Sequence, residues 1–318
     1  MKYNGNSLKD VAIYVCCYPG DYHLAKLLCE SIRYFCGQIP IFLIKDGKFS
    51  TLQINRLGNI YEFKETDVPE QLKGVRGWGL QKLFAFFQRD FERFLYLDAD
   101  IVLLKNPFVI PFQKFDFYVD TSGFKDLNGP LPGIGFRGSF PLAAAPYTFD
   151  PIKLGHFDAE FDLQNVLLFN SGHIFGKSSL LDADTVKKCV DEVNKGGNLF
   201  FWDGGILNYL FNKGHQEGRF TLGGECFRIF GSDPPEKWPA LTVRAVLDGT
   251  FQDRVLIHWA GPSKRGKEIF YGSILEAFRT LYYRRLHPLA YPLDVARRAL
   301  STRFRGMAQR WKRVGSAL

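Results

Sequence analysis

Short apolar runs alternate with segments of helical periodicity along most of the chain. An apolar run over residues 11–17 is followed by apolar positions spaced three and four apart over 22–35, and then by a second apolar run at 39–44. A buried strand, an amphipathic helix and another buried strand at this spacing predict a βαβ unit. The pattern therefore predicts an α/β domain with a mostly parallel sheet and flanking helices.

The same pattern continues, with polar or glycine- and proline-containing breaks between the segments. Apolar runs predict further strands at residues 94–97, 101–104, 166–175 and 255–259. Helical spacing predicts helices at residues 80–91, 180–193 and 206–211. Residues 111–165 are rich in Gly and Pro and weakly periodic, which is typical of a functional loop or lid. We therefore predict one domain over residues 1–275 that carries this stretch as a long loop or insert.

The net charge is concentrated at the C-terminus. Residues 276–318 hold ten basic and two acidic residues, which accounts for the whole formal net charge of +8. Aromatic and apolar residues alternate with the arginines, a pattern that favours an anionic membrane surface, where each basic residue contributes about 1 kcal/mol. We predict a basic, helical, membrane-associating tail. Nucleic-acid binding is the rival interpretation, and a solvated charged tail is the simplest one.

Composition and cysteine usage set the broad class. Hydrophobic residues make up 46% of the 318 residues and charged residues 23%, which is enough for a full core and argues against global disorder. The six cysteines show no zinc-ligand spacing, which favours reduced, buried thiols. The polar N-terminus has no signal-peptide core, and no stretch reaches about 18 apolar residues. We expect a cytoplasmic protein, peripheral on the cytoplasmic face of the membrane.

Two aspartates follow the predicted strand at 94–97. Asp98 and Asp100 are separated by Ala99, and the alternation of side chains along a strand points both carboxylates to one face. They leave the strand at the edge of the sheet where open α/β sheets bind ligands. Paired carboxylates there suit Mg²⁺ or Mn²⁺ holding a diphosphate. A turn in which the acids cap backbone amides is the alternative interpretation.

Two further segments carry candidate polar chemistry. His258 lies at the end of the last predicted strand, where a neutral imidazole could be a third metal ligand, although a lone histidine there is more often a satisfied polar residue. Gly261 lets the backbone approach a phosphate, and Lys264 would add positive charge beside it. Asp203 precedes two glycines near a predicted helix start, and the local sequence favours a helix N-cap over a catalytic carboxylate.

Taken together, these motifs resemble glycosyltransferase family 8, the retaining enzymes of GT-A fold that include glycogenin and bacterial lipooligosaccharide galactosyltransferases. That family shares a Lys ahead of an Asp-x-Asp strand, a Phe-Asn-Ser-Gly strand, an Asp-Gln-x-x-x-Asn turn and a His-x-x-Gly-x-x-Lys segment. The matching pieces, in the same order, are Lys82, Asp98-Ala99-Asp100, Phe169-Asn170-Ser171-Gly172, Asp203 to Asn208, and His258 to Lys264. The resemblance covers residues 11–270 and implies a GT-A fold with a Rossmann-like sheet.

The resemblance also implies an activity and a set of site residues. The activity is transfer of a hexose from a nucleotide donor, UDP-sugar, to a glycan or lipid-linked acceptor, with retention of the anomeric configuration. Sorted by role, the implied residues are Asp98, Asp100 and His258 for Mn²⁺ or Mg²⁺; Cys17, Tyr18, Tyr22, Lys82, Ala99, Gly261 and Lys264 for the nucleotide-sugar; and Asp203, Lys82 and Asn170 for catalysis at the sugar.

The chain departs from the family pattern at one position of the site. Gly204 stands where the family has Gln, whose side chain lies near the anomeric carbon, so no nucleophile is available from that position. Two other classes of function remain open on the sequence. A sugar nucleotidyltransferase would share the metal site but normally has a basic Gly-rich loop after the first strand, which residues 18–21 lack. A non-catalytic membrane or nucleic-acid adaptor would use the tail alone.

Overall fold

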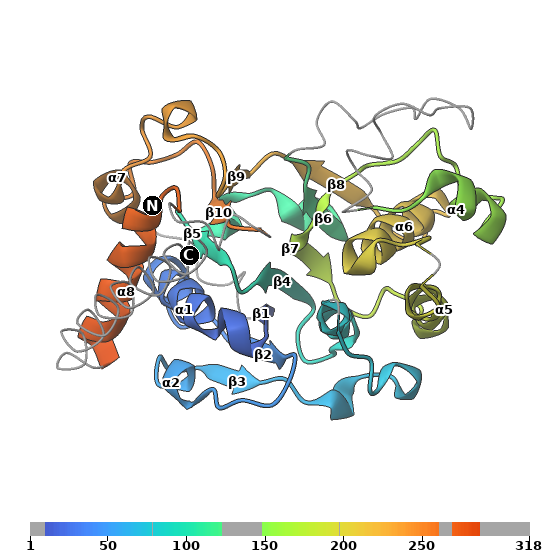
Figure 1. The fold of residues 1–318 in the computed structure, drawn as a ribbon, viewed down its shortest axis with the longest axis horizontal. Helices are drawn as coiled ribbons and strands as arrows, with labels where there is room; N and C mark the ends of the chain where they lie inside the picture. Colours follow the sequence, from blue (N-terminus) through green and yellow to red (C-terminus); the bar gives the residue numbers. More distant parts are fainter. Residues whose placement is uncertain (1–9, 78, 123–147, 197, 261–268, 287–318) are drawn as a thin grey trace, which may run out of the picture.

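The computed structural model describes residues 10–77, 79–122, 148–196, 198–260 and 269–286. Its centre is a seven-stranded sheet (Figure 1). In spatial order the strands are β3 (Ile60–Glu62), β2 (Ile41–Lys45), β1 (Val11–Cys17), β4 (Arg93–Asp98), β7 (Asn170–Lys177), β6 (Phe117–Asp120) and β8 (Leu222–Glu225). Every neighbouring pair is parallel except those that β7 makes with β4 and β6. The mostly parallel α/β sheet predicted from the sequence is therefore confirmed.

A second, three-stranded sheet continues from the end of β4. It contains β5 (Ile101–Leu103), β10 (Leu256–His258) and β9 (Arg228–Phe230), in that order. The strand β10 is antiparallel to β5 and parallel to β9. Only Ala99 and Asp100 separate β4 from β5, so the chain passes from one sheet to the other at the Asp-x-Asp motif.

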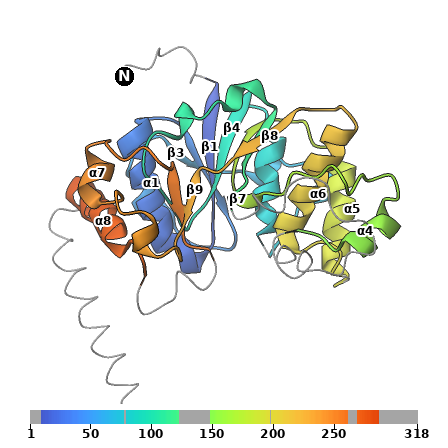
Figure 2. The same ribbon diagram turned by 90° about the horizontal axis from the view of Figure 1, so that it is seen from above.

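Helices cover both faces of the large sheet (Figure 2). On one side lie α1 (Tyr22–Cys36), α7 (Val243–Leu247) and α8 (Gly272–Leu286), and on the other lie α4 (Pro151–Phe157), α5 (Ala183–Asn194) and α6 (Trp202–Gln216). A short α2 (Leu52–Asn55) precedes β3. The 3-10 helices are η1 (Pro19–Asp21), η2 (Glu65–Asp67), η3 (Glu70–Leu72), η4 (Leu80–Phe87), η5 (Pro107–Val109), η6 (Phe112–Lys114) and η8 (Pro235–Lys237).

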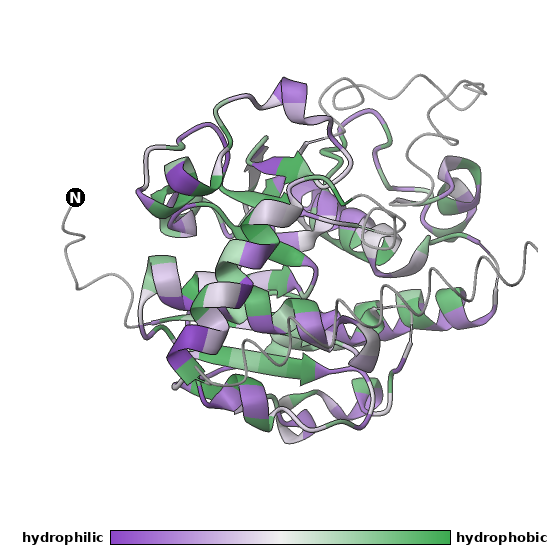
Figure 3. Cartoon of the chain, turned by 60° about the vertical axis from the view of Figure 1, so that its left-hand side comes forward, coloured by the Kyte–Doolittle hydropathy of each residue, from purple (hydrophilic) through white to green (hydrophobic). Residues whose placement is uncertain are grey.

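The alternation along β1 divides the core into two layers. Ile13 and Val15 are fully buried in a cluster with α1, whereas Ala12 and Tyr14 are buried in a cluster with η4 and α6. Each such large apolar side chain contributes about 1.5–3 kcal/mol when fully buried. Hydrophobic residues dominate the strands, and hydrophilic ones gather on outer helices and loops (Figure 3). Among the described residues, no helix is both long enough and apolar enough to cross a bilayer.

The boundaries of some predicted elements differ from the structure. The first strand covers the predicted residues, but the predicted helix at 80–91 is the 3-10 helix η4, which ends at Phe87. The expectation of a continuous loop over 111–165 is wrong for two segments, because β6 is an inner strand of the large sheet and α4 follows at Pro151. All four residues of β6 are buried, so the strand is too short and too uniform to show a period. Residues 123–147 lie outside the described residues.

The folded domain extends beyond the boundary that the sequence predicted between domain and tail. The predicted boundary at 275/276 falls inside α8, which packs against α1. Tyr282 is buried, and Arg285 Nη2 lies 2.9 Å from the buried carboxylate of Glu30. Residues 276–286 therefore belong to the folded domain. The rest of the predicted tail, residues 287–318, lies outside the described residues.

Candidate active site

Three side chains with metal-ligating atoms meet where the two sheets join. Asp98 is the last residue of β4, Asp100 precedes β5, and His258 is the last residue of β10, paired in register with Ile101 of β5. One ligand atom from each of the three lies within 4.8 Å of the others. His258 Nε2 is 3.2 Å from Asp100 Oδ1 and 4.0 Å from Asp98 Oδ2. Pairing of β5 with β10 therefore assembles the three residues that the sequence suggested as metal ligands.

A glycine leaves the space in which the three ligand atoms converge. Gly172 lies on β7, beside β4. A Cβ atom there would lie 2.6 Å from His258 Cε1 and 2.8 Å from Asp98 Oδ2, closer than real Cβ contacts. Any larger residue would push into the converging side chains. Two carboxylates and a neutral imidazole are a donor set that fits a divalent cation such as Mn²⁺ or Mg²⁺.

Lys82 links this group to a third carboxylate. Its Nζ lies 3.2 Å from Asp98 Oδ1 and 2.6 Å from Asp203 Oδ2, and its side chain is 5% exposed. Ser171 Oγ donates a hydrogen bond of 2.7 Å to the same Asp203 oxygen. One oxygen of Asp203 is therefore held by two partners, and the carboxylate cannot rotate freely. Sequence reasoning named Lys82 but missed Ser171, although the Asn-Ser-Gly segment carries it.

The structure overturns the interpretation of Asp203 as a helix cap. Helix α6 begins at Trp202, its N-cap residue is Phe201, and no side chain caps it. Asp203 is the second residue of the helix, and its carboxylate turns to Lys82. The local sequence predicted a later helix start because Gly204 and Gly205 read as a turn. Both glycines are instead buried in the first turn of α6.

The charges of the site are unbalanced. Three carboxylates, Asp98, Asp100 and Asp203, lie near one ammonium, Lys82, so these four side chains carry a formal charge of −2. Burial alone would lower the pKa of Lys82, but Asp203 and Asp98 raise it above its usual value and keep the amine charged. Burial raises the pKa of Asp98, and the carboxylate of Asp100 adds to the rise against the attraction of Lys82. A divalent cation would balance the excess negative charge.

A second charged group lies buried behind His258, and sequence reasoning missed it. Asp120 on β6 lies 3.1 Å from Arg228 Nε and 3.0 Å from His173 Nε2. Although burial opposes it, the pair of Arg228 and His173 lowers the pKa of Asp120 to about 2. Burial lowers the pKa of His173 to about 4, so this imidazole is neutral. Because Arg228 belongs to the small sheet, the group joins the two sheets whose junction forms the site.

The candidate site opens into a cavity of about 350 Å³. Its lining includes Asp98, Ala99, Asp100, Lys82 and Asp203, all named from the sequence, and also Cys16, Tyr18, Asp21, Asp46, Gly79 and Trp202. Tyr18 and Trp202 are 37% and 47% exposed. Of the lining residues, sequence reasoning assigned no role to Cys16, Asp21, Asp46, Gly79 and Trp202, because none of them carries a ligand pattern of its own.

Four predicted site residues lie elsewhere or are not described. Cys17 faces the buried cluster with α1 instead of the cavity, because successive side chains of β1 point to opposite faces and Cys16 has the cavity side. Tyr22 packs edge-on against Phe49, with ring centroids 5.5 Å apart, and does not line the cavity. Gly261 and Lys264 lie outside the described residues.

Asn170 supports the site from within the sheet. It is buried, and its side-chain oxygen accepts a hydrogen bond of 2.9 Å from the backbone N–H of Gly172. Asn170 therefore holds the backbone of the glycine that leaves space for the three ligand atoms. All six cysteines are free, as expected from their spacing.

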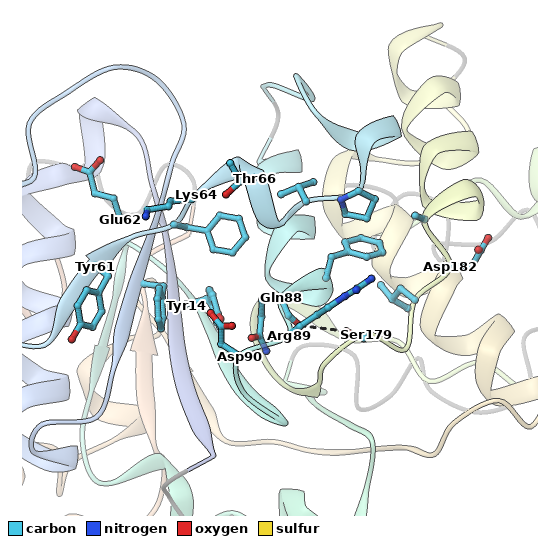
Figure 4. Close-up of a pocket in the computed structure, with 17 residues that line it drawn as sticks. Tyr14, Tyr61, Glu62, Lys64, Thr66, Gln88, Arg89, Asp90, Ser179 and Asp182 are labelled. Carbon is cyan, nitrogen blue, oxygen red and sulfur yellow. Dashed lines mark hydrogen bonds between the residues drawn. The ribbon is translucent and has the colours of Figure 1, made fainter.

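A larger cavity of about 1040 Å³ lies at the other end of η4 (Figure 4). Tyr14 and Tyr61 line it from the sheet, Gln88 and Arg89 from the end of η4, and Asp182 from the start of α5. By volume alone, this larger cavity would be the candidate active site. However, the only group of three possible metal ligands in the described part of the chain borders the smaller one, so we place the candidate active site there.

Comparison with known proteins identifies the fold. No protein-family model matches the chain, and no curated protein matches its sequence. The galactosyltransferase LgtC, solved in complex with donor and acceptor sugar analogues, matches with a TM-score of 0.52 and 13% identity, over 85% of this chain and 95% of LgtC. An active-site mutant of LgtC matches with a TM-score of 0.50 and 13% identity, over 84% and 95%.

A longer protein is also similar. The bifunctional glycosyltransferase WbbM matches with a TM-score of 0.49 and 15% identity over 86% of this chain, which spans only 51% of the length of WbbM. At these identities the similarity establishes the fold alone. The chain has the fold of LgtC, and the GT-A fold expected from the sequence motifs is confirmed.

Proposed function

We propose that this chain is a metal-dependent glycosyltransferase that moves a hexose from UDP to a glycan acceptor. The observation that carries the proposal is the cluster of Asp98, Asp100 and His258, whose two aspartates line the same cavity of a GT-A fold as the Lys82–Asp203 pair. A cavity of about 350 Å³ lined by five aspartates, one lysine and two exposed aromatic rings suits a small ligand that brings both a cation and flat groups. The LgtC structure with sugar analogues supports the same activity here.

Each residue has a task in this reaction. Mn²⁺ or Mg²⁺ would be held by Asp98, Asp100 and His258 and, when bound, neutralises the diphosphate that leaves. Asp203 faces the sugar, whose anomeric carbon gains positive charge as its bond to the diphosphate lengthens. Lys82 and Ser171 fix the orientation of that carboxylate in advance, so no reorientation is needed during the reaction.

Retention of the anomeric configuration is part of the proposal and rests on the resemblance to family 8. Residue 204 is Gly, so the carboxylate that could stabilise or capture the sugar is that of Asp203. The anomeric proton coupling of the new linkage, measured by NMR on the first product formed, reads the outcome directly. An inverted linkage would contradict this part of the proposal while leaving metal-dependent transfer intact.

The decisive experiment is isothermal titration with UDP, in the presence of Mn²⁺, Mg²⁺ or EDTA. We expect UDP to bind with either metal and to bind much more weakly in EDTA. Asp100→Ala should lose the metal dependence and turnover, because it removes one of three ligands, yet unfold like the wild type. The control is Asp116→Ala, which removes an aspartate that follows η6, lies beside Lys177 and does not line the cavity. Metal-independent UDP binding, or near wild-type turnover of Asp100→Ala, would contradict the metal site.

The same titration separates the other classes of function. A non-catalytic adaptor would bind no UDP in a metal-dependent way, and a nucleotidyltransferase would release pyrophosphate from UTP and a sugar phosphate. A thermal-shift screen of nucleotide sugars with Mn²⁺ then identifies the donor.

We further propose that residues 287–318 hold the protein on an anionic membrane surface. These residues contain seven Arg or Lys and one acid, a balance that favours anionic lipid headgroups. Deleting residues 287–318, and not the buried part of α8, should release the protein from vesicles of anionic phospholipid while UDP binding persists. Sedimentation of the truncated protein with such vesicles at physiological salt would show that the tail is not the anchor.

A further inference from the structure

A large aromatic side chain lines the candidate active site in a backbone conformation that its residue type disfavours. Trp202 has a φ of +56°, in the left-handed region that residues with a Cβ rarely adopt. Its side chain is 47% exposed, and it lines the cavity that also contains Asp98, Asp100 and Lys82. Strained residues of this kind persist where the surrounding structure forces them, and they cluster at functional sites.

The surrounding backbone holds this conformation tightly. The N–H of Phe201 donates to the carbonyl of Thr148 at 2.9 Å, and the N–H of Trp202 donates to the carbonyl of Phe200 at 3.1 Å. In the same turn, a Cβ atom on Gly205 would lie 2.2 Å from the Thr148 carbonyl oxygen, so the first turn of α6 packs directly on that backbone. The start of α6 is therefore rigid, and it presents Trp202 in one place.

The position of this ring along the cavity indicates which part of the substrates it meets. Trp202 is the neighbour of Asp203, the carboxylate proposed to face the sugar. The second exposed ring of the cavity is Tyr18, which follows β1 and which the resemblance assigns to the nucleotide-sugar. The two rings thus come from different elements and line one cavity together with the metal-ligating aspartates and Lys82, so each can serve a different part of the substrates.

We propose that Trp202 is the platform on which a pyranose ring of the acceptor stacks. The face of an aromatic ring is negatively polarised and attracts the C–H groups on the apolar face of a pyranose, while the hydroxyls at the edges stay solvated. A half-exposed indole suits such a ligand, because only one face needs to be covered. The acceptor is then a glycan that ends in a pyranose, and not a lipid phosphate or a protein side chain. This inference rests on the proposed function.

Saturation-transfer NMR with three defined probes tests the proposal. The probes are methyl β-galactopyranoside, methyl β-glucopyranoside and lactose, each added to the full-length protein with UDP and Mn²⁺. We expect at least one probe to bind the wild type, with the strongest saturation on its ring C–H protons. In Trp202→Ala its affinity should fall about tenfold, in Trp202→Phe it should largely survive, and UDP affinity should change by less than about twofold in both.

The matched control is Tyr61→Ala. Tyr61 is 50% exposed and lines the larger cavity, so its removal should leave probe binding unchanged. The proposal is overturned if no probe binds the wild type in the presence of UDP and Mn²⁺, or if Trp202→Ala binds the probes as well as the wild type does. It is also overturned if UDP affinity falls in Trp202→Ala, because the ring would then stack on the base. If the wild type fails to bind UDP with Mn²⁺, the proposed function has failed, and this inference falls with it.

Discussion

Removing the charge of Asp203 while keeping its shape tests the proposed mechanism most directly. In Asp203→Asn the amide oxygen can still accept the hydrogen bond that Ser171 Oγ now donates at 2.7 Å. Lys82 loses the carboxylate at 2.6 Å but keeps Asp98 at 3.2 Å, so its ammonium remains paired. We therefore expect the fold to survive and the electrostatic contribution of the site to change.

The expected loss of rate follows from the distance and the charge. Two unit charges about 4 Å apart interact with about 4 kcal/mol at an effective dielectric constant of about 20. The anomeric carbon gains only part of a charge in the transition state, so the loss should be about 2–3 kcal/mol, or roughly a hundredfold in turnover. Because this charge is absent from the ground state, donor affinity should change little.

The assay compares turnover, the KM of the donor, UDP affinity and unfolding in urea on the purified variant. Asp184→Asn is the matched control, since Asp184 is the second residue of α5 as Asp203 is of α6, but it is exposed and bonds to Gln71. Any effect that comes only from removing a negative charge near the N-terminus of a helix would appear in both variants. A stable Asp203→Asn enzyme with turnover within a few-fold of wild type would refute the reasoning and leave the group that faces the sugar unidentified.

Three further predictions follow from the close contacts at Gly172, the left-handed backbone of Trp202 and the lowered pKa of the buried His173. Gly172→Ala should weaken Mn²⁺ binding by about tenfold or more, because its Cβ would lie 2.6 Å from a ligand imidazole carbon, and calorimetry showing unchanged affinity would contradict this. Trp202→Gly should be more stable to urea than Trp202→Ala by about 1 kcal/mol, because only the alanine keeps the left-handed strain, and equal stabilities would show that the backbone is unstrained. Stability should fall from pH 6.5 to pH 4, because the unfolded chain binds a proton that native His173, with a pKa of about 4, does not. This effect is worth up to about 3 kcal/mol, and in His173→Asn the loss of stability to urea between pH 6.5 and pH 4 should shrink by up to that amount.

Local sequence determined the parts of this protein that depend on neighbouring residues. The apolar run of β1 and the amphipathic period of α1 are short-range patterns, and both elements lie where the pattern placed them. The two aspartates at the end of β4 point to one side because strand geometry alternates, which holds in any fold. The order of the motifs along the chain was enough to indicate a GT-A fold, which the structural comparison confirms.

Tertiary structure alone decided which side chains meet. His258 reaches Asp100 only because β10 pairs with β5 across more than 150 residues of sequence, and no local signal specifies that pairing. Alternation requires Cys16 and Cys17 to face opposite sides, but the packing of α1 on one face decides that Cys16 lines the cavity. Asp203 shows the same limit: its neighbours in sequence favoured a helix cap, whereas Lys82, on a different helix, turned its carboxylate into the site. A local sequence pattern reflects the interactions within one segment, whereas a site depends on long-range contacts that form only when the whole chain folds.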